Sequence, residues 1–138
     1  RMKPDLSGLA EPVRWLKTTV PDPDPRHHAG LCAAIHGKGS FDHVGYEGMF
    51  LFKAGGRYYL ACAENIDGRY SCMVATANHL LGPYGERYEA IPGGGHNTFF
   101  QDASGQWFST FFGPPWYERA AILPITIGAD GRIQTRDN

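Results

Sequence analysis

Net charge, long apolar runs and cysteine are all scarce in this sequence of 138 residues. Lys and Arg number 13 and Asp and Glu number 14, which leaves a formal net charge of −1. A chain so close to neutral has no basic field to hold a phosphate backbone, so we expect no nucleic-acid partner. No run approaches the roughly 20 apolar residues that span a bilayer, so we expect no membrane partner. Residues 1–30 contain no signal-peptide core, and a start at Arg1 instead of Met suggests a processed or partial chain.

The cysteines form no CxxC pair, which argues against a zinc site. Cys62 and Cys72 flank one expected hairpin, and whether they face each other depends on its turn. A four-residue loop from Asn65 to Gly68 places Cys62 opposite Ser71, whereas a three-residue loop ending at Gly68 sets it opposite Cys72. Both alternatives stay open, and two small buried hydrophobic thiols are the simplest interpretation.

Glycine and proline are abundant: Gly (18) and Pro (10) make 18 + 10 = 28 residues. This is about a fifth of the chain, against a usual share of roughly 12%, and it excludes a helical bundle. Between these turn residues lie short aromatic and β-branched runs typical of strands. Pro124 indicates that its strand is at an edge or bulged. We therefore predict an all-β chain with strands at 48–53, 57–64, 69–76, 86–91, 96–102, 106–113, 119–127 and 132–135.

An internal repeat is the most informative pattern. A shift of 49 residues brings Phe50 onto Phe99 (99 − 50 = 49) and Gly56 onto Gly105, and aligns three successive strands. Four antiparallel strands in roughly 40–50 residues are typical of a β-propeller blade. Two meanders in a sandwich are the alternative, but a sandwich does not explain one phase across three strands. We expect blades at 46–92 and 93–138, preceded by a partial blade and turn-rich linker at 1–45, or about two and a half blades in all.

The same shift brings Glu47 onto His96 (96 − 47 = 49) at the start of the first strand of each unit. In a propeller the first strands lie innermost, so their starting residues surround one mouth of the central channel. Gly48 follows Glu47 and Gly95 precedes His96, which allows close approach of backbone or ligand. The two residues predict a polar site on the axis, with charged strand ends that merely face solvent as the alternative.

Four segments together resemble a known family: EGMFLFKAGGRYYL, YSCMVATANHLLGPY, GGGHNTFFQDASGQWFSTFF and RAAILPITIGADGRI. In this order and spacing they are similar to the C-terminal half of glycoside hydrolase family 43, over about residues 46–135. The resemblance implies a five-bladed propeller that cleaves arabinosides, xylosides and related glycans with inversion. It also suggests a secreted or periplasmic location.

The resemblance also implies roles for single residues. Glu47 matches the general acid, whose carboxyl needs a raised pKa from a desolvated pocket and a nearby carboxylate. His96 matches an axial histidine that lies beside a calcium ion or water cluster in the channel, and no other cofactor is implied. Arg119 resembles an arginine near the site. We add Trp116 as a candidate for stacking on sugar, together with Trp107 and Tyr117, although core packing suits Trp107 better.

The second carboxylate of an inverting glycosidase is not apparent. None of the acidic residues upstream of Glu47 starts an apolar strand; they are Asp5, Glu11, Asp22, Asp24 and Asp42. The catalytic set is thus incomplete, and the alternative function is a non-catalytic carbohydrate-binding or interaction fragment. The histidines of the 21–45 segment have no zinc-like spacing; they are His27, His28, His36 and His43.

Assembly provides the first testable prediction. A stack of about two and a half blades exposes blade faces that further blades of the same parent protein or a second copy must cover. Burying ~1,000 Å² contributes roughly 25 kcal/mol at about 25 cal/mol/Å², against ~4–15 kcal/mol of lost rigid-body freedom. Light scattering at micromolar concentration should therefore find a homodimer or a larger ring. A well-folded monomer would contradict the expectation.

Overall fold

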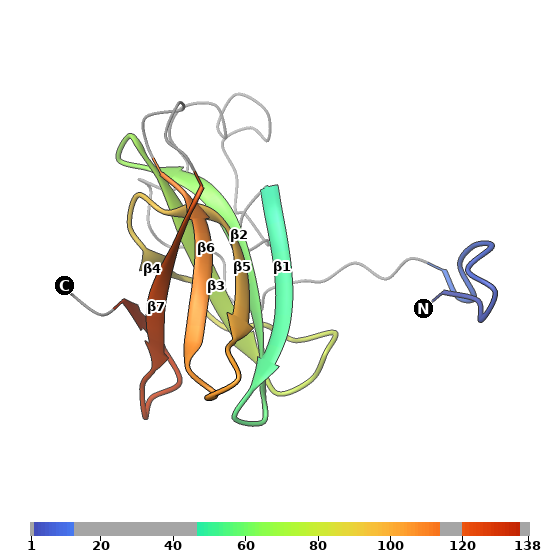
Figure 1. Cartoon of the computed structure of the whole chain (residues 1–138). Coiled ribbons are helices and arrows are strands. Elements are labelled where there is room, and N and C mark those ends of the chain that lie inside the picture. The colour runs from blue at the N-terminus through green and yellow to red at the C-terminus, as the bar shows by residue number, and fades with distance from the viewer. Residues whose placement is uncertain (1, 13–46, 114–119, 136–138) are drawn as a thin grey trace.

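The computed structural model describes residues 2–12, 47–113 and 120–135, and the elements in these ranges are β-strands (Figure 1). Each strand starts and ends within two residues of an expected segment, because Gly, Asn and Asp turn residues bound it. The all-β prediction is confirmed. The strands are β1 (Glu47–Ala54), β2 (Arg57–Ile66), β3 (Arg69–Ala77), β4 (Tyr88–Ile91), β5 (Gly95–Gln101), β6 (Trp107–Phe112), β7 (Ala121–Ile127) and β8 (Ile133–Thr135).

The strands form two antiparallel sheets in simple chain order, β1-β2-β3-β4 and β5-β6-β7-β8. Every strand therefore pairs with its neighbour in sequence, as in a meander or a propeller blade. Residues 2–12 carry one bridge, Met2 to Leu9, and lie apart from both sheets (Figure 1). The partial blade expected within 1–45 falls mainly on 13–46, outside the described residues.

The turn between β2 and β3 corrects the sequence analysis. Ile66 pairs with Arg69, so the loop is the two-residue Asp67-Gly68 rather than three or four residues. Both loop residues have positive φ, 48° and 77°, as in the type I′ turn that Asp-Gly favours. Cys62 then lies opposite Met73, so neither cysteine alternative was right.

The two thiols lie in different hydrophobic clusters, Cys72 with Val74 between the sheets and Cys62 with Leu60 in a second cluster. Both are free and buried. Burial raises the pKa of the Cys62 thiol to about 12 and raises that of Cys72 still further. A thiol that stays protonated is a poor nucleophile and a poor ligand, so both cysteines act as small core residues.

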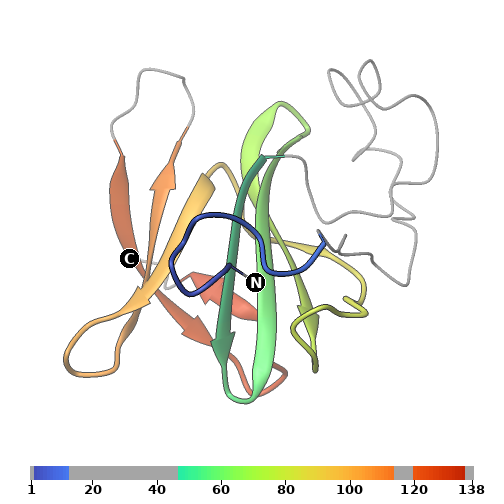
Figure 2. The same cartoon turned by 90° about the vertical axis from the view of Figure 1, so that its right-hand side faces the viewer.

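Aromatic side chains hold the two sheets together. The ring of Phe52 stacks on Tyr59 and on Phe99, with centroids 4.8 Å apart in each pair. Trp107 adds a tilted contact to Phe52 at 5.3 Å. Ile125 is fully buried in the same cluster. The expected core role of Trp107 is confirmed, and the interface fixes how the second sheet lies on the first (Figure 2).

The strand pairing corrects the repeat phase by one residue in two of the three strands. Tyr59 and Phe108 correspond with a shift of 108 − 59 = 49, but their first-strand partners, Phe52 and Phe100, differ by 100 − 52 = 48. Their third-strand partners, Thr76 and Pro124, also differ by 124 − 76 = 48. The ladder equivalent of Glu47 is consequently Gly95, and His96 comes one residue later.

The corrected phase explains how the sheets meet. Phe52 and Tyr59 point into the interface, whereas their counterparts Phe100 and Phe108 stack on each other at 5.7 Å outside it. The two sheets therefore use opposite faces for this contact. The first sheet uses the face that carries Phe52 and Tyr59, and the second uses the face opposite the one that carries Phe100 and Phe108. Successive blades related by rotation about a channel stack in this way.

The other face of the first sheet buries an ion pair. Nη1 of Arg87 donates to Oε2 of Glu64, and both side chains are almost fully buried. Leu60 and Tyr84 pack in the adjoining cluster, where Oη of Tyr84 donates to the carbonyl of Leu80 at 2.8 Å. The ion pair and this second cluster thus form a buried layer on this face of the first sheet.

Removing the charge of Glu64 should be costly. In Glu64→Gln the buried Arg87 guanidinium loses its counter-charge, so we expect a loss of about 3–5 kcal/mol in unfolding free energy. Glu89→Gln is the matched control, because Glu89 meets the half-exposed Arg69 at 3.5 Å and should lose less than about 1 kcal/mol. Urea unfolding compares the variants. Equal losses would show that burial of the pair does not matter.

Candidate functional site

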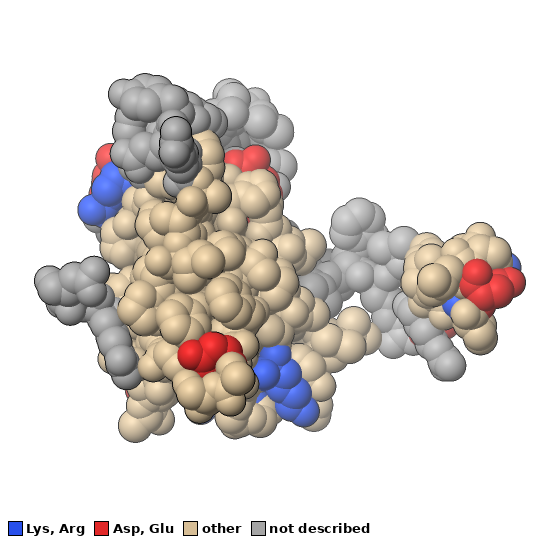
Figure 3. All heavy atoms as spheres, viewed as in Figure 1, with Lys and Arg blue, Asp and Glu red and all other residues tan. Residues whose placement is uncertain are grey.

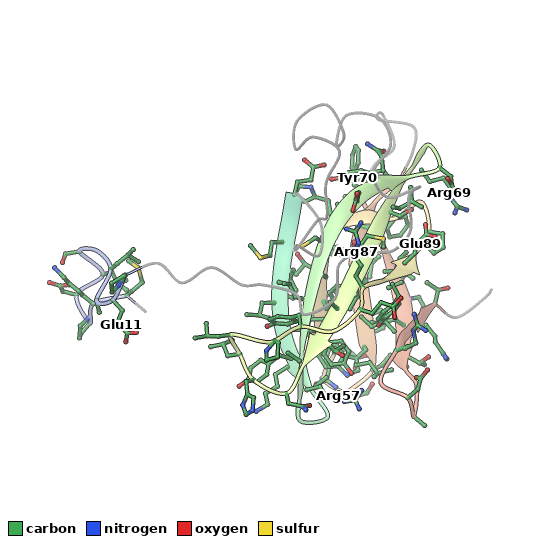
Figure 4. All side chains as sticks on the ribbon, turned by 180° about the vertical axis from the view of Figure 1, so that it is seen from behind. Glu11, Arg57, Arg69, Tyr70, Arg87 and Glu89 are labelled. Atoms are coloured by element: carbon green, nitrogen blue, oxygen red, sulfur yellow. The ribbon has the colours of Figure 1, made fainter. Side chains whose placement is uncertain are left out.

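A cleft of about 490 Å³ opens at the end of the sheets where β1 and β5 begin. Figure 4 labels Tyr70, one of its lining residues, at this end. Both first strands contribute, and the ends of β3 and β6 complete the described wall. The polar lining comes from both sheets and the apolar lining from the second. The lining residues are Glu47, Tyr70, His96, Thr110, Phe111, Phe112 and Ala120.

Glu47 is the first residue of β1 and pairs with Ala63. A bulge follows, because the pairing moves three residues along β1, to Phe50, and two along β2, to Ala61. Gly48 within the bulge has a φ of +59°, a conformation that favours glycine. The bulge interrupts the regular pairing of β1 with β2 directly after Glu47. The side chain of Glu47 is exposed and lines the cleft.

His96 lies in the corresponding bulge of β5, between Gly95 and Thr98. Its φ of +58° is uncommon for a residue other than glycine. The neighbouring Asn97 fixes this backbone, because its Nδ2 donates to Ser109 Oγ and to the Thr110 carbonyl, both at 3.0 Å. The imidazole thereby reaches the cleft, where its Nδ1 lies 3.1 Å from Oη of Tyr70.

The glycines before His96 are required by close packing. A Cβ on Gly95 would lie 2.7 Å from two ring carbons of Tyr70, and one on Gly94 would lie 2.7 Å from Ile91. A Cβ on Gly48 would approach His96 to 3.1 Å. The close approach of backbone that the sequence predicts is found at Gly48, where a Cβ would lie 3.2 Å from the Cα of His96, and the Tyr70 ring occupies the corresponding space at Gly95.

The structure brings Glu47 and His96 to one cleft and adds Tyr70, which the sequence analysis missed. A signal was present: Tyr70 is the second residue of the strand that follows the Asp67-Gly68 turn, but only the cross-strand register shows that it lies at the same end of the sheet as Glu47. Trp116, Tyr117 and Arg119 lie outside the described residues.

The upstream carboxylates that the structure describes do not reach the cleft lining. Asp5 accepts from the backbone N and Oγ of Ser7, and these hydrogen bonds lower its pKa. It therefore stabilises a local turn in the 2–12 segment. Among the described residues, no three His, Cys, Asp or Glu side chains are grouped to hold a metal ion. A calcium ion near His96 stays a prediction.

Solved structures match the chain, although no family model and no curated protein sequence does. One is a bifunctional GH43-CE protein of Bacteroides eggerthii, at 25% identity and TM-score 0.67, covering 99% of this chain and 16% of that one. Another is an endo-1,4-β-xylanase of Bacteroides thetaiotaomicron, at 24% identity and TM-score 0.56, covering 67% and 38%. The fold is that of part of a family 43 glycoside hydrolase propeller.

An exo-1,5-α-L-arabinanase from a bovine ruminal metagenomic library also matches, at 20% identity and TM-score 0.56, covering 66% of this chain and 38% of that one. The resemblance to family 43 and the propeller architecture are thus confirmed as a likeness of fold. The chain spans less than two fifths of the length of each of these structures. The described part of the chain contains no helix long and apolar enough to cross a membrane.

Gly95→Ala tests the packing that builds the cleft. The new methyl group would lie 2.7 Å from the Tyr70 ring, so we expect a loss of about 1–3 kcal/mol in stability. Gly85→Ala is the control, because its nearest neighbour would be a carbonyl oxygen at 3.9 Å. Denaturant unfolding measures both. A loss no larger than that of the control would mean that Tyr70 does not press on β5.

Proposed function

We propose that the chain contributes the general-acid half of a family 43-like glycoside hydrolase, which cleaves arabinosides, xylosides or related glycans by inversion once its propeller is complete. The observation that supports this is the meeting of Glu47 and His96, from two successive sheets, in one cleft. The likeness of fold to family 43 propellers supports the reaction class, and a glycan or small glycoside is the proposed substrate.

In this proposal Glu47 protonates the leaving glycosidic oxygen. Phe111, Phe112 and Ala120 line the cleft together with Glu47 and supply apolar surface. Glycan bound there would exclude water from the reacting groups. Arg119 and Trp116, which lie outside the described residues, would contact the sugar.

The catalytic base must come from outside the described cleft. An inverting enzyme needs a second carboxylate ~6.5–9.5 Å from the acid to activate water. Glu47 is the single carboxylate among the described lining residues. Further blades would bring the base, and they would also bring the oxygen ligands that a calcium ion beside His96 needs.

The exposed face of the second sheet is where we propose that those blades pack. Phe100 and Phe108 stack there, and Ile122 is 62% exposed. Figure 3 shows few charged side chains on the described surface over β5, β6 and β7. Upstream blades of the same parent protein, or those of a second copy, would bury this apolar surface and close the ring.

Glu47→Gln in the complete propeller tests the assignment. Losing general-acid catalysis should lower kcat/KM about 10²–10⁴-fold on an alkyl arabinoside or xyloside, whose leaving group needs a proton. An aryl glycoside with a good leaving group should lose much less. Glu89→Gln, which changes a carboxylate on β4 away from the cleft lining, is the control. Undiminished cleavage of the alkyl glycoside by Glu47→Gln would overturn the role.

A second candidate function is glycan binding without turnover. The single carboxylate of the described cleft favours it, and Phe111 and Phe112 of the wall still offer apolar surface on which a sugar could stack. Calorimetry with xylo- and arabino-oligosaccharides on the 138-residue chain, combined with a product assay, separates the two. Binding without product formation, both in the 138-residue chain and after further blades are supplied, would favour this function.

A further inference from the structure

The side chain of Tyr70 reaches from the first sheet to the second at the cleft. It lies in β3 of the first sheet, yet its ring packs on Gly95 of β5 so closely that a Cβ there would clash at 2.7 Å. Ala63 of β2 lies against the same glycine, at 3.2 Å from that Cβ position. The ring is thus wedged between the first sheet and the backbone of the second.

The Tyr70 hydroxyl ends at the His96 ring, with Oη 3.1 Å from Nδ1. Gly48 of β1 packs on the ring near the same nitrogen. Two residues of the first sheet therefore hold a side chain that belongs to the second. Since Glu47 precedes Gly48, this arrangement sets the position of His96 relative to the proposed acid.

The chemistry of the pair decides which atom carries the proton. A neutral imidazole has one N–H donor and one nitrogen that accepts. A phenol, with a pKa near 10, is a far stronger acid than a neutral imidazole N–H, and the imidazole lone pair is the better acceptor. The stable arrangement has Tyr70 Oη donating to Nδ1, which leaves the proton on Nε2.

We propose that Tyr70 is a positioning residue that holds neutral His96 as the Nε2–H tautomer, so that His96 offers the cleft a hydrogen-bond donor. Such a nitrogen has no lone pair for a cation, so a calcium ion would meet His96 only through water. Its natural partner is an oxygen acceptor such as a sugar hydroxyl. That use on a glycan rests on the proposed function, whereas the tautomer does not.

Nitrogen NMR on the ¹⁵N-labelled 138-residue chain, above the pH at which histidine is charged, tests the proposal. We expect a protonated-type shift at Nε2 of His96 and an unprotonated-type shift at Nδ1. His96→Gln identifies the signals by removing them. In Tyr70→Phe the ring still fills the space against Gly95 but the donor is gone, so the two nitrogen shifts should move towards each other as both tautomers become populated.

Tyr84→Phe is the matched control, because it removes a hydroxyl that donates at 2.8 Å to Leu80, in the cluster on the other face of the first sheet. It should leave the His96 shifts unchanged at a comparable cost in stability. A proton on Nδ1 in the unmodified chain would overturn the proposal, even if Tyr70→Phe fails to fold. Unchanged shifts in a folded Tyr70→Phe would also overturn it. Neither spectrum involves a glycan, so a negative activity result for Glu47 leaves this test intact.

Discussion

The contact on which the rest of the structure depends is the aromatic stack between the sheets. Phe52 lies between Tyr59 of its own sheet and Phe99 of the next, with 4.8 Å between centroids on both sides. Stacked aromatic pairs contribute about 0.5–1.5 kcal/mol each beyond the area they bury. They also fix geometry, because offset rings permit few relative positions of two sheets. The same contact fixes the geometry of the cleft, because Glu47 belongs to the first sheet and His96 to the second.

Much of the fold could be predicted from the sequence because turn-forming residues mark the ends of most strands. The strands lie within two residues of the expected ones, since glycine and asparagine or aspartate turns bound most of them. The phase was harder. The first turn of the second sheet is one residue longer than that of the first sheet, because Gln101 and Trp107 enclose residues 102–106 whereas their equivalents Lys53 and Tyr58 enclose residues 54–57. This extra residue changes the phase between the first two strands, and no residue type in the sequence announces it.

Two sequence-based expectations, for one turn and for one proline, differ from the structure. Asp67-Gly68 is a strong two-residue hairpin signal, yet longer loops were weighed instead. Pro124 suggested an edge or bulged strand, but β7 lies inside its sheet. The short β8 pairs only from Ile125 onward, so the proline avoids the ladder on that side. The partnership of Tyr70 with His96 could not be predicted, because it joins residues of different sheets.

Cys62 and Cys72 lie on opposite sides of the first sheet. Cys72 belongs to the cluster that the second sheet covers, and Cys62 to the cluster around Tyr84. A thiol with a strongly raised pKa reacts only when its surroundings open and water reaches it. Alkylation of Cys72 would therefore report separation of the two sheets, and alkylation of Cys62 would report loosening of the opposite face. Comparing the alkylation rates of the two thiols would therefore show which face of the first sheet becomes accessible to solvent first.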